Sequence, residues 1–264
     1  MRYIQVTLNG AISMFDLRDK TAVVTGGNGG IGLGIARGLA QAGANIVLAA
    51  RNVNKTASAV IELESLGANA VGVTTDVTDV ESIRGAISQT IDLFGGLDIL
   101  VNNAGANIRQ RPEEYSTEDF QSVQDINLKG LFVFCREVHH NMATRGGGKI
   151  INIGSMASIF GLDWGVSYAA SKGGVVQLTK SLAVAWAVDN IQVNAILPGW
   201  IKTDLTAPIE TKFPERFKQV SERIPQQRWG EPNDFSGIAV FLASGASDYV
   251  TGTAIPIDGG YSVF

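Results

Sequence analysis

The sequence is poor in the residues on which several kinds of enzyme depend. Its 264 residues include one cysteine, Cys135, and two histidines, His139 and His140. A single cysteine excludes an intrachain disulfide, and its apolar surroundings, GLFVFCREV, favour a buried packing residue over a nucleophile. Because the two histidines are adjacent, they point to different faces of a helix. We therefore expect neither a metal site nor a Ser-His-Asp triad, and no GxSxG stretch supports a hydrolase.

An excess of charge and long apolar runs are also missing. The formal net charge is −4 and no long run of one sign occurs, whereas a nucleic-acid partner usually requires a basic face. No apolar stretch is long and uncharged enough to span a bilayer, and residues 1–13 lack the apolar stretch of a signal peptide. We expect a cytoplasmic protein, with residues 1–14 as an N-terminal extension and residues 15–264 as a single dinucleotide-binding catalytic domain.

Proline is scarce, and only Pro112 of the seven prolines precedes residue 198. In that long region short β-branched runs alternate with helical patterns, which predicts an α/β fold. Several runs are apolar almost throughout, as parallel strands covered on both faces should be. We expect one Rossmann-like, doubly wound parallel sheet of seven strands with helices on both faces. The later prolines suggest an irregular insertion within 198–232. The expected strands are 21–25, 45–50, 69–75, 97–102, 148–154, 191–197 and 253–258, and the expected helices lie near 31–42, 53–66, 79–94, 117–144, 166–189 and 232–243.

Glycine, in contrast, is abundant and concentrated in TGGNGGIG, residues 25–32. This stretch joins the first expected strand directly to the first expected helix. A turn of this kind lets the backbone approach a pyrophosphate, and the helix N-terminus supplies free N–H groups and the positive end of a dipole. Glycines at such turns can also serve packing alone. A Walker A loop is excluded because no Gly-Lys-Ser/Thr follows.

The glycine spacing is TGxxxGxG, which resembles the short-chain dehydrogenase/reductase family. Further stretches match this family in the same order, so that the resemblance covers roughly residues 17–262. Within the family, RIPQQRWGEP at 223–232 and the residues after NNAG are most similar to the gluconate 5-dehydrogenase and glucose-dehydrogenase-like branch. The matching stretches are Asp76-Val77, NNAG at 102–105, Ile126-Asn127, Ser155, YAASK with Tyr168 and Lys172, and PGWIKT at 198–203.

Four residues are candidates for the chemistry. Tyr168 and Lys172 are four positions apart and share one helix face, where an ammonium would lower the pKa of the phenol and make it a usable acid or base. Ser155 follows the fifth expected strand, at the end where ligands bind in open α/β sheets. The resemblance implies that Tyr168 exchanges the proton, Ser155 positions the substrate oxygen, and Lys172 also binds the nicotinamide ribose. It also implies that Asn127 holds a water in a proton relay. Taken singly, each residue could equally be structural.

The second expected strand bears on the choice of cofactor. Dinucleotide folds that prefer NAD usually place an acid after this strand, but here Ala50 is followed by Arg51. These two positions favour NADP, with NAD as the alternative, although Gly29 lacks the basic side chain that NADP-preferring relatives often carry there. The resemblance implies cofactor contacts from Gly26, Asn28, Gly30, Ile31, Gly32, Arg51, Asp76, Val77, Asn102, Ala104, Gly105, Tyr168, Lys172, Pro198, Gly199, Ile201 and Thr203.

These patterns predict an NAD(P)-dependent oxidoreductase that transfers a hydride between the nicotinamide and a secondary alcohol or ketone. The alternative is a non-catalytic dinucleotide-binding regulator, since a fold does not fix a function. The helical patterns at 117–144 and 166–189 carry more apolar residues than one buried face needs. The resemblance implies that they pair across subunits in a homotetramer, with a dimer as the alternative.

Substrate contacts are the least specified part of the prediction. Arg109 and Arg111 follow NNAG, where an arginine could hold a carboxylate such as that of a sugar acid, or could simply be solvated. Trp164 and Trp200 could line the same pocket or merely pack. The segments expected to form the pocket are 106–112, 156–165 and 199–224.

Overall fold

The computed structural model describes residues 14–264. Seven parallel strands form one sheet in the order β3-β2-β1-β4-β5-β6-β7, so the predicted doubly wound α/β fold is confirmed. All but the last residue of the expected N-terminal extension, residues 1–13, lie outside the described residues. The strands are β1 (Thr21–Thr25), β2 (Asn45–Ala50), β3 (Ala70–Thr74), β4 (Ile99–Asn102), β5 (Gly148–Ile153), β6 (Ile191–Pro198) and β7 (Ala254–Ile257).

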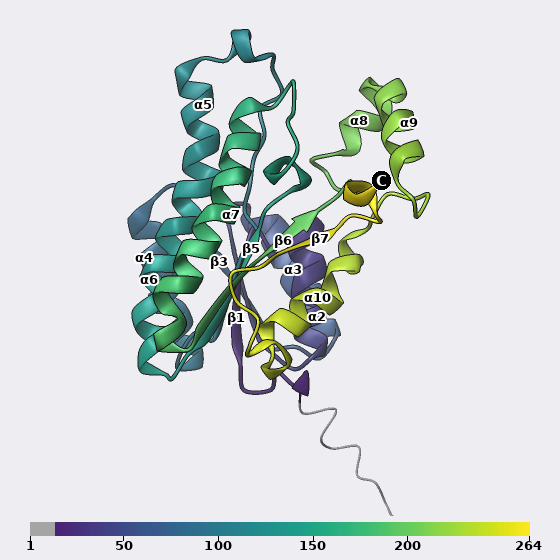
Figure 1. Ribbon diagram of the computed structural model, residues 1–264. Helices are drawn as coiled ribbons and strands as arrows, with labels where there is room; N and C mark the ends of the chain where they lie inside the picture. The colour runs from purple at the N-terminus through teal and green to yellow at the C-terminus, as the bar shows by residue number, and fades with distance from the viewer. Residues whose placement is uncertain (1–13) are drawn as a thin grey trace, which may run out of the picture.

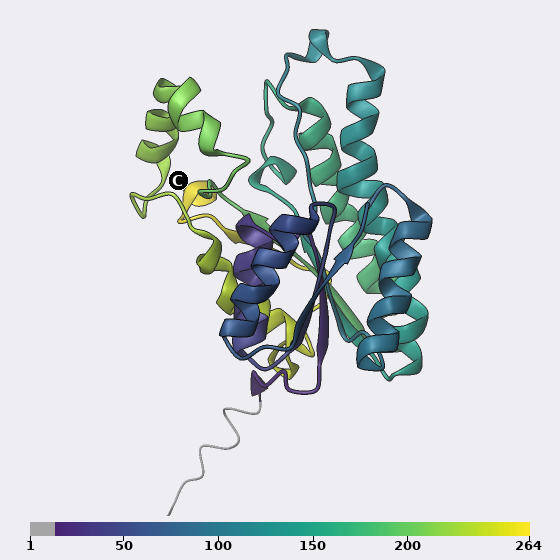
Figure 2. The same cartoon turned by 180° about the vertical axis from the view of Figure 1, so that it is seen from behind.

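Helices cover both faces of the sheet (Figures 1 and 2). One face carries α2 (Gly30–Gln41), α3 (Val53–Ser65) and α10 (Ser236–Ala243), and the other carries α4 (Val80–Phe94), α6 (Gly130–Thr144) and α7 (Val166–Trp186). Each set packs its own apolar core against the sheet. The central strand β1 is therefore buried along its whole length, which explains its uninterrupted apolar sequence. Between residues 14 and 264, no helix combines the length and apolarity needed to cross a membrane.

Two segments differ from the sequence-based expectation. The expected helix 117–144 consists of α5 (Thr117–Gln124), a π-helical turn η2 (Asp125–Lys129) and α6. The expected irregular insertion instead contains two helices, α8 (Ala207–Lys212) and α9 (Pro214–Arg223), which stand beyond the sheet near the C-terminus (Figure 1). Proline in both helices lies in the first turn, where its missing N–H would have no partner. Proline therefore marks helix starts here.

The strand order reverses between β1 and β4, and the loops after these two strands lie side by side. Gly26, with a φ of 61°, begins the glycine loop, and a Cβ added there would lie 3.1 Å from the Cα of Ala104. Only glycine fits this close approach without strain. In open α/β sheets ligands bind outside the carboxyl ends of the strands at such a reversal.

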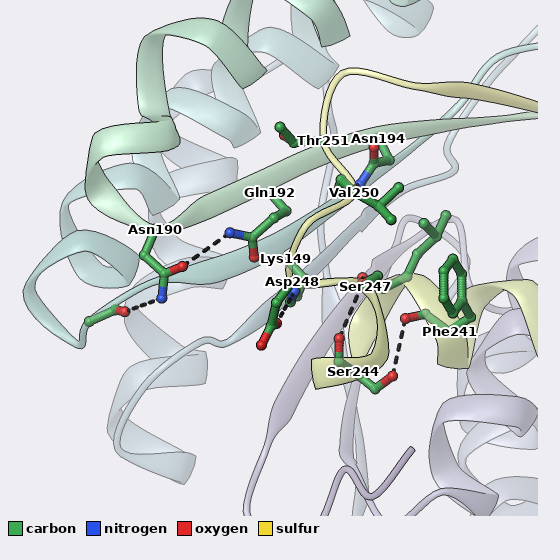
Figure 3. A network of polar contacts seen from close by, with 12 residues as sticks. Lys149, Asn190, Gln192, Asn194, Phe241, Ser244, Ser247, Asp248, Val250 and Thr251 are labelled. Atoms are coloured by element: carbon green, nitrogen blue, oxygen red, sulfur yellow. Dashed lines mark hydrogen bonds and ion pairs between the residues drawn. The ribbon is translucent and has the colours of Figure 1, made fainter. Parts of the chain in front are cut away.

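Toward the amino ends of β5 and β6, side chains fasten the sheet to the chain that precedes β7 (Figure 3). Lys149 pairs with Asp248 at 2.7 Å. The buried amide of Asn194 donates to the carbonyl of Val250 at 2.7 Å and accepts from the N–H of Thr253 at 3.2 Å. Both amide atoms of Asn194 are thus partnered within the protein.

Candidate active site

The glycine loop forms one wall of a cleft at the carboxyl ends of the central strands. Helix α2 begins at Gly30, and the N–H groups of a first helical turn have no intrahelical partner. These groups and the positive end of the helix dipole suit a pyrophosphate. A Cβ added to Gly32 would lie 2.7 Å from the carbonyl oxygen of Gly26, so Gly32 allows α2 to pack closely but does not line the cleft.

The cleft has two adjoining parts, one reaching Lys172 and the other reaching Arg51. All but two of the sequence-predicted cofactor residues line it, the exceptions being Gly32 and Asn102. The lining residues among them are Gly26, Asn28, Gly30, Ile31, Arg51, Asp76, Val77, Ala104, Gly105, Tyr168, Lys172, Pro198, Gly199, Ile201 and Thr203.

Asn102 lies away from the cleft, contrary to the expectation. Its side-chain nitrogen donates to Asn152 Oδ1 at 2.9 Å and to Cys135 Sγ at 3.2 Å. The next residue, Asn103, lines the cleft instead and donates to the carbonyl of Gly26 at 3.1 Å. Successive side chains along a strand point to opposite sides, so only one of these neighbours can face the cleft. Burial raises the pKa of the Cys135 thiol to about 12, which makes Cys135 a packing residue, as expected.

Asp76 and Arg51 lie at the far end of the cleft. Thr78 donates to the Asp76 carboxylate from its backbone N–H at 2.9 Å and from its hydroxyl at 2.7 Å. These hydrogen bonds, and the positive charge of Arg51, hold the pKa of Asp76 below its ordinary value. Asp76 is thus a stable anion in the part of the cleft that Arg51 also lines.

Ser155 and Tyr168 lie where the cleft meets a second cavity, and both residues line both hollows. Tyr168 is in the first turn of α7, and Ser155 follows β5 and caps a short 3₁₀ helix. Lys172 lies one turn beyond Tyr168, and its Nζ donates to the carbonyl of Ile153 at 2.6 Å. Three of the four predicted catalytic side chains, those of Ser155, Tyr168 and Lys172, are therefore brought together by the end of β5 and the start of α7.

The pKa of Tyr168 differs from the expectation that Lys172 lowers it. Burial raises the pKa of Tyr168, and the hydrogen bond with Ser155 and the charge of Arg109 oppose that rise. The Lys172 ammonium lies 5.7 Å from the centre of the tyrosine ring and is directed to the Ile153 carbonyl. Burial lowers the pKa of Lys172 itself to about 8. Arg109, and not Lys172, is therefore the cation that opposes the rise in the pKa of Tyr168.

Asn127 lies in the π-helical turn and is buried. Its Oδ1 accepts from the N–H of Ala106 at 2.8 Å, and its Nδ2 donates to the carbonyl of Ala106 and to Ser171 Oγ. Asn127 does not contact Lys172. A Cβ added to Gly105 would nevertheless lie 3.4 Å from Asn127 Oδ1 and 3.7 Å from Lys172 Nζ, so the two side chains flank one glycine.

The second cavity has a volume of about 580 Å³ and lies beside Tyr168. All three segments expected from the sequence contribute to it, together with Tyr261 near the C-terminus. It is lined by Arg109, Arg216 and Arg223 and by no aspartate or glutamate among the described residues. Trp164 and Trp200 also line it, whereas Arg111 pairs with Glu113 outside it. The cavity is therefore suited to an anion.

Three buried polar atoms of this cavity have no hydrogen-bond partner in the described part of the chain. They are Asn107 Oδ1, Arg109 Nε and Trp164 Nε1. The Arg109 guanidinium lies 5.3 Å from the centre of the Trp164 ring and donates to the carbonyl of Leu205. Since unpartnered buried polar groups are costly, a polar group bound beside these side chains would be favourable. Asn107 lies in the expected segment 106–112 but was not singled out, and Tyr261 lies outside all three expected segments.

Neither histidine lines the cleft or the second cavity, as a Ser-His-Asp triad with Ser155 would require. His139 pairs with Asp189 at 2.9 Å and packs on Trp186, and none of these residues lines either hollow. Within residues 14–264, no three of His, Cys, Asp and Glu gather in a way that could hold a metal ion. Ser155 therefore has no histidine partner.

Comparison with known proteins defines the class to which this site belongs. A family model described as enoyl-(acyl carrier protein) reductase matches residues 26–262, and the chain belongs to the short-chain dehydrogenase/reductase family. It is an NAD(P)-dependent oxidoreductase that acts on an alcohol or carbonyl group.

Within that family the chain is similar to dehydrogenases of sugar acids. The 2-dehydro-3-deoxy-D-gluconate 5-dehydrogenase of Escherichia coli (strain K12) is 41% identical over 251 residues, which are 95% of this chain and 98% of that protein. The gluconate 5-dehydrogenase of Gluconobacter oxydans (strain 621H) is 37% identical over 95% of this chain and 97% of its own length. The crystal structure of a gluconate 5-dehydrogenase from Burkholderia cenocepacia J2315 in complex with NADP and tartrate has a TM-score of 0.91, with 37% identity, over 96% of this chain and 99% of that chain.

Proposed function

We propose that the protein is an NADP-dependent dehydrogenase that interconverts a secondary alcohol and a ketone on a sugar acid. The observation that carries this proposal is the position of Ser155 and Tyr168. Both line the cofactor cleft and the arginine-lined cavity at the point where these meet. A reacting carbon placed there would face the cofactor on one side and a proton-transferring phenol on the other.

The nicotinamide, when bound, supplies or accepts the hydride. Tyr168 gives the proton to the forming hydroxyl, or takes it in the reverse direction, while Ser155 holds the substrate oxygen by a hydrogen bond. Lys172, with its pKa lowered to about 8, binds the ribose of the nucleotide and restores the proton of Tyr168. Asn127 fixes the loop at Ala106 and keeps one Oδ1 lone pair for a water next to Lys172.

The substrate class rests on the charge of the second cavity. Arg109 is half-buried beside Tyr168 and has an unpartnered Nε, so its guanidinium can hold a carboxylate by two parallel hydrogen bonds. The relatives named above act on gluconate or 2-dehydro-3-deoxy-D-gluconate, and one was crystallised with tartrate, a hydroxylated dicarboxylate. A hydroxylated carboxylate satisfies both the charge and the unpartnered polar atoms of this cavity.

A substrate panel tests the function directly. Gluconate, 5-ketogluconate, neutral polyols of equal length and simple ketones are assayed by cofactor absorbance with NADP(H) and NAD(H). We expect turnover of the acids with NADP(H), far slower turnover of the neutral polyols, and none of either with the Tyr168→Phe variant. Turnover of neutral and acidic compounds at equal efficiency would refute the assignment of a sugar acid.

We further propose a cytoplasmic homotetramer. Phe132 on α6 and Val184 on α7 are large apolar side chains that remain 39% and 82% exposed, and these helices lie on the same face of the sheet (Figure 1). Apolar surface of this kind is typical of a subunit interface. Light scattering should give four times the chain mass, and Val184→Glu should reduce it, whereas a monomeric wild-type protein would refute the assembly.

A further inference from the structure

We propose that Lys55 is a second cation for the 2′-phosphate of NADP, and that the carboxylate of Asp204 occupies Lys55 until the cofactor displaces it. This proposal concerns cofactor binding alone and rests on the cofactor assignment in the proposed function. Lys55 has no place in the sequence motifs. It is in the first turn of α3, where its backbone N–H donates to Asn52 Oδ1 at 2.9 Å.

The position of Lys55 is the first argument. Its side chain lines both parts of the cofactor cleft, the part that Arg51 and Asp76 also line and the part that Gly29 and Gly30 of the glycine loop also line. A Cβ added to Gly29 would lie 2.7 Å from both Cε and Nζ of Lys55. The missing side chain at Gly29 therefore leaves the space that the lysine occupies. The cation that the glycine loop itself lacks is supplied by α3.

The charge available to a 2′-phosphate is the second argument. Arg51 shares its part of the cleft with the carboxylate of Asp76, so it is not the only charge near a 2′-phosphate bound there. A phosphate monoester carries nearly two negative charges at pH 7. Arg51 and Lys55 lie four residues apart on either side of the N-cap of α3, and together they can balance this charge. NAD carries no such group, so the pair would distinguish the two cofactors.

The partner of Lys55 in the present structure is the third argument. Its Nζ lies 2.7 Å from Asp204 Oδ2, which belongs to the segment between β6 and α8. The Asp204 side chain is 89% exposed, and ion pairs in such surroundings are weak. A doubly charged phosphate held at the same time by Arg51 would therefore replace the carboxylate. Asp204 directly follows Thr203, and Thr203 lies close to the glycine loop, since its Cγ2 would be 3.3 Å from a Cβ added to Gly30. The replacement of the carboxylate by the phosphate would therefore take place beside the glycine loop.

Calorimetric titration with two matched ligand pairs tests both halves of the proposal. NADP⁺ is compared with NAD⁺, and 2′,5′-ADP is compared with 5′-AMP, which isolates the phosphate from the nicotinamide. For Lys55→Met we expect the dissociation constants of NADP⁺ and 2′,5′-ADP to rise about tenfold or more, and those of NAD⁺ and 5′-AMP to stay within about twofold. For Asp204→Asn we expect the opposite sign, with NADP⁺ binding about two- to fivefold tighter.

The ion pair between Lys149 and Asp248 (Figure 3) provides the control, because it has the same 2.7 Å separation but neither residue lines the cleft. Lys149→Met and Asp248→Asn should leave all four dissociation constants unchanged. Equal weakening of NAD⁺ and NADP⁺ by Lys55→Met would overturn the assignment to the 2′-phosphate. An unchanged NADP⁺ constant in Asp204→Asn would overturn the competition. If Lys55→Met does not fold, Lys55→Gln is titrated in its place. Binding is measured without turnover, so a failure of the proposed enzymatic reaction would leave these outcomes readable.

Discussion

The two ends of the same parallel sheet differ in whether their buried polar atoms have hydrogen-bond partners. Toward the amino ends, both amide atoms of Asn194 are partnered, and Lys149 meets Asp248 (Figure 3). At the carboxyl end, Arg109 Nε and Trp164 Nε1 are buried without partners. In residues 14–264, every buried side-chain nitrogen or oxygen atom that lacks a partner belongs to the end of β4, to the loop after it, or to the loop before α7. Such atoms cost stability. One end of the sheet thus satisfies its buried polar groups within the protein, whereas, in the described chain, three of the five unpartnered atoms at the other end belong to residues that line the second cavity.

The largest expected effect follows from removing the proton-transferring group at the carboxyl end. Tyr168→Phe should lower kcat by a factor of about 10³, since a positioned acid or base contributes roughly 10²–10⁴. NADP⁺ binding should change by less than about twofold. The exposed Tyr249 provides the control, and Tyr249→Phe should leave kcat unchanged. Steady-state kinetics and calorimetry check both, and a Tyr168→Phe enzyme with more than a tenth of the wild-type kcat would contradict the assigned role.

Removal of the cation next to Tyr168 should have the next largest effect. Arg109→Met should raise KM for the sugar acid about 10- to 100-fold, because a charge-assisted hydrogen-bond pair is lost. It should leave the KM of a neutral polyol nearly unchanged. Arg111→Met is the matched control, since Arg111 is exposed and pairs with Glu113. Kinetics with acid and neutral substrates separate the outcomes, and equal losses for both would show that Arg109 has only a structural role.

The other end of the sheet should respond in stability and not in activity. Asn194→Ala removes a buried amide and leaves the Val250 carbonyl and the Thr253 N–H without their partner. We expect the free energy of unfolding to fall by about 2 kcal/mol, with kcat/KM unchanged. Urea denaturation measures the first and initial rates the second. The exposed Asn69 provides the control in Asn69→Ala. A large loss of kcat/KM in Asn194→Ala would break the contrast between the two ends.

The smallest predicted effect is a pH dependence of stability. Burial lowers the pKa of Lys172 from its ordinary value to about 8, so between that value and the unfolded pKa the unfolded chain binds more protons than the folded chain. Stability should therefore rise with pH across this window, by on the order of 1 kcal/mol between pH 8 and 9.5. Urea denaturation of the cofactor-free protein tests this, with Lys172→Met as the control that should lose the slope. A slope of the opposite sign in the wild type would contradict the burial of a neutral lysine.

Much of the fold could be predicted because parallel strands covered on both faces leave uninterrupted apolar runs. The expected strand at 191–197 corresponds to β6, which is buried along its whole length. The proposed catalytic pair Tyr168 and Lys172 was accessible for a different reason. Tyr168 and Lys172 lie one helical turn apart, so their spacing in the sequence fixes their proximity. Features that are local in sequence could be found in this way.

Features that depend on tertiary contacts could not be predicted from the sequence. Whether Asn102 or Asn103 lines the cleft depends on the direction in which each side chain points at the end of β4, and the sequence does not give this direction. The ammonium of Lys55 reaches the glycine loop only because α3 packs against that loop, and nothing in its neighbourhood marks it. Burial raises the pKa of Tyr168, and the hydrogen bond with Ser155 and the charge of Arg109, 59 residues earlier in the chain, oppose the rise. The four-residue spacing that identified Tyr168 therefore suggested Lys172 as the cation that lowers its pKa, whereas Arg109 is that cation.

The π-helical turn at Asp125–Lys129 also restricts how the chain length can change. A π turn contains one residue more than the α-helical turn it replaces, and here that segment carries Asn127 to Ala106. Deleting one residue would give a continuous α-helix from α5 into α6. It would also turn the two flanking helices relative to one another by about 100°, so that either Asn127 or the buried face of α6 would point the wrong way. The single-residue excess is thus a point at which the chain cannot be shortened without losing either the site or the core.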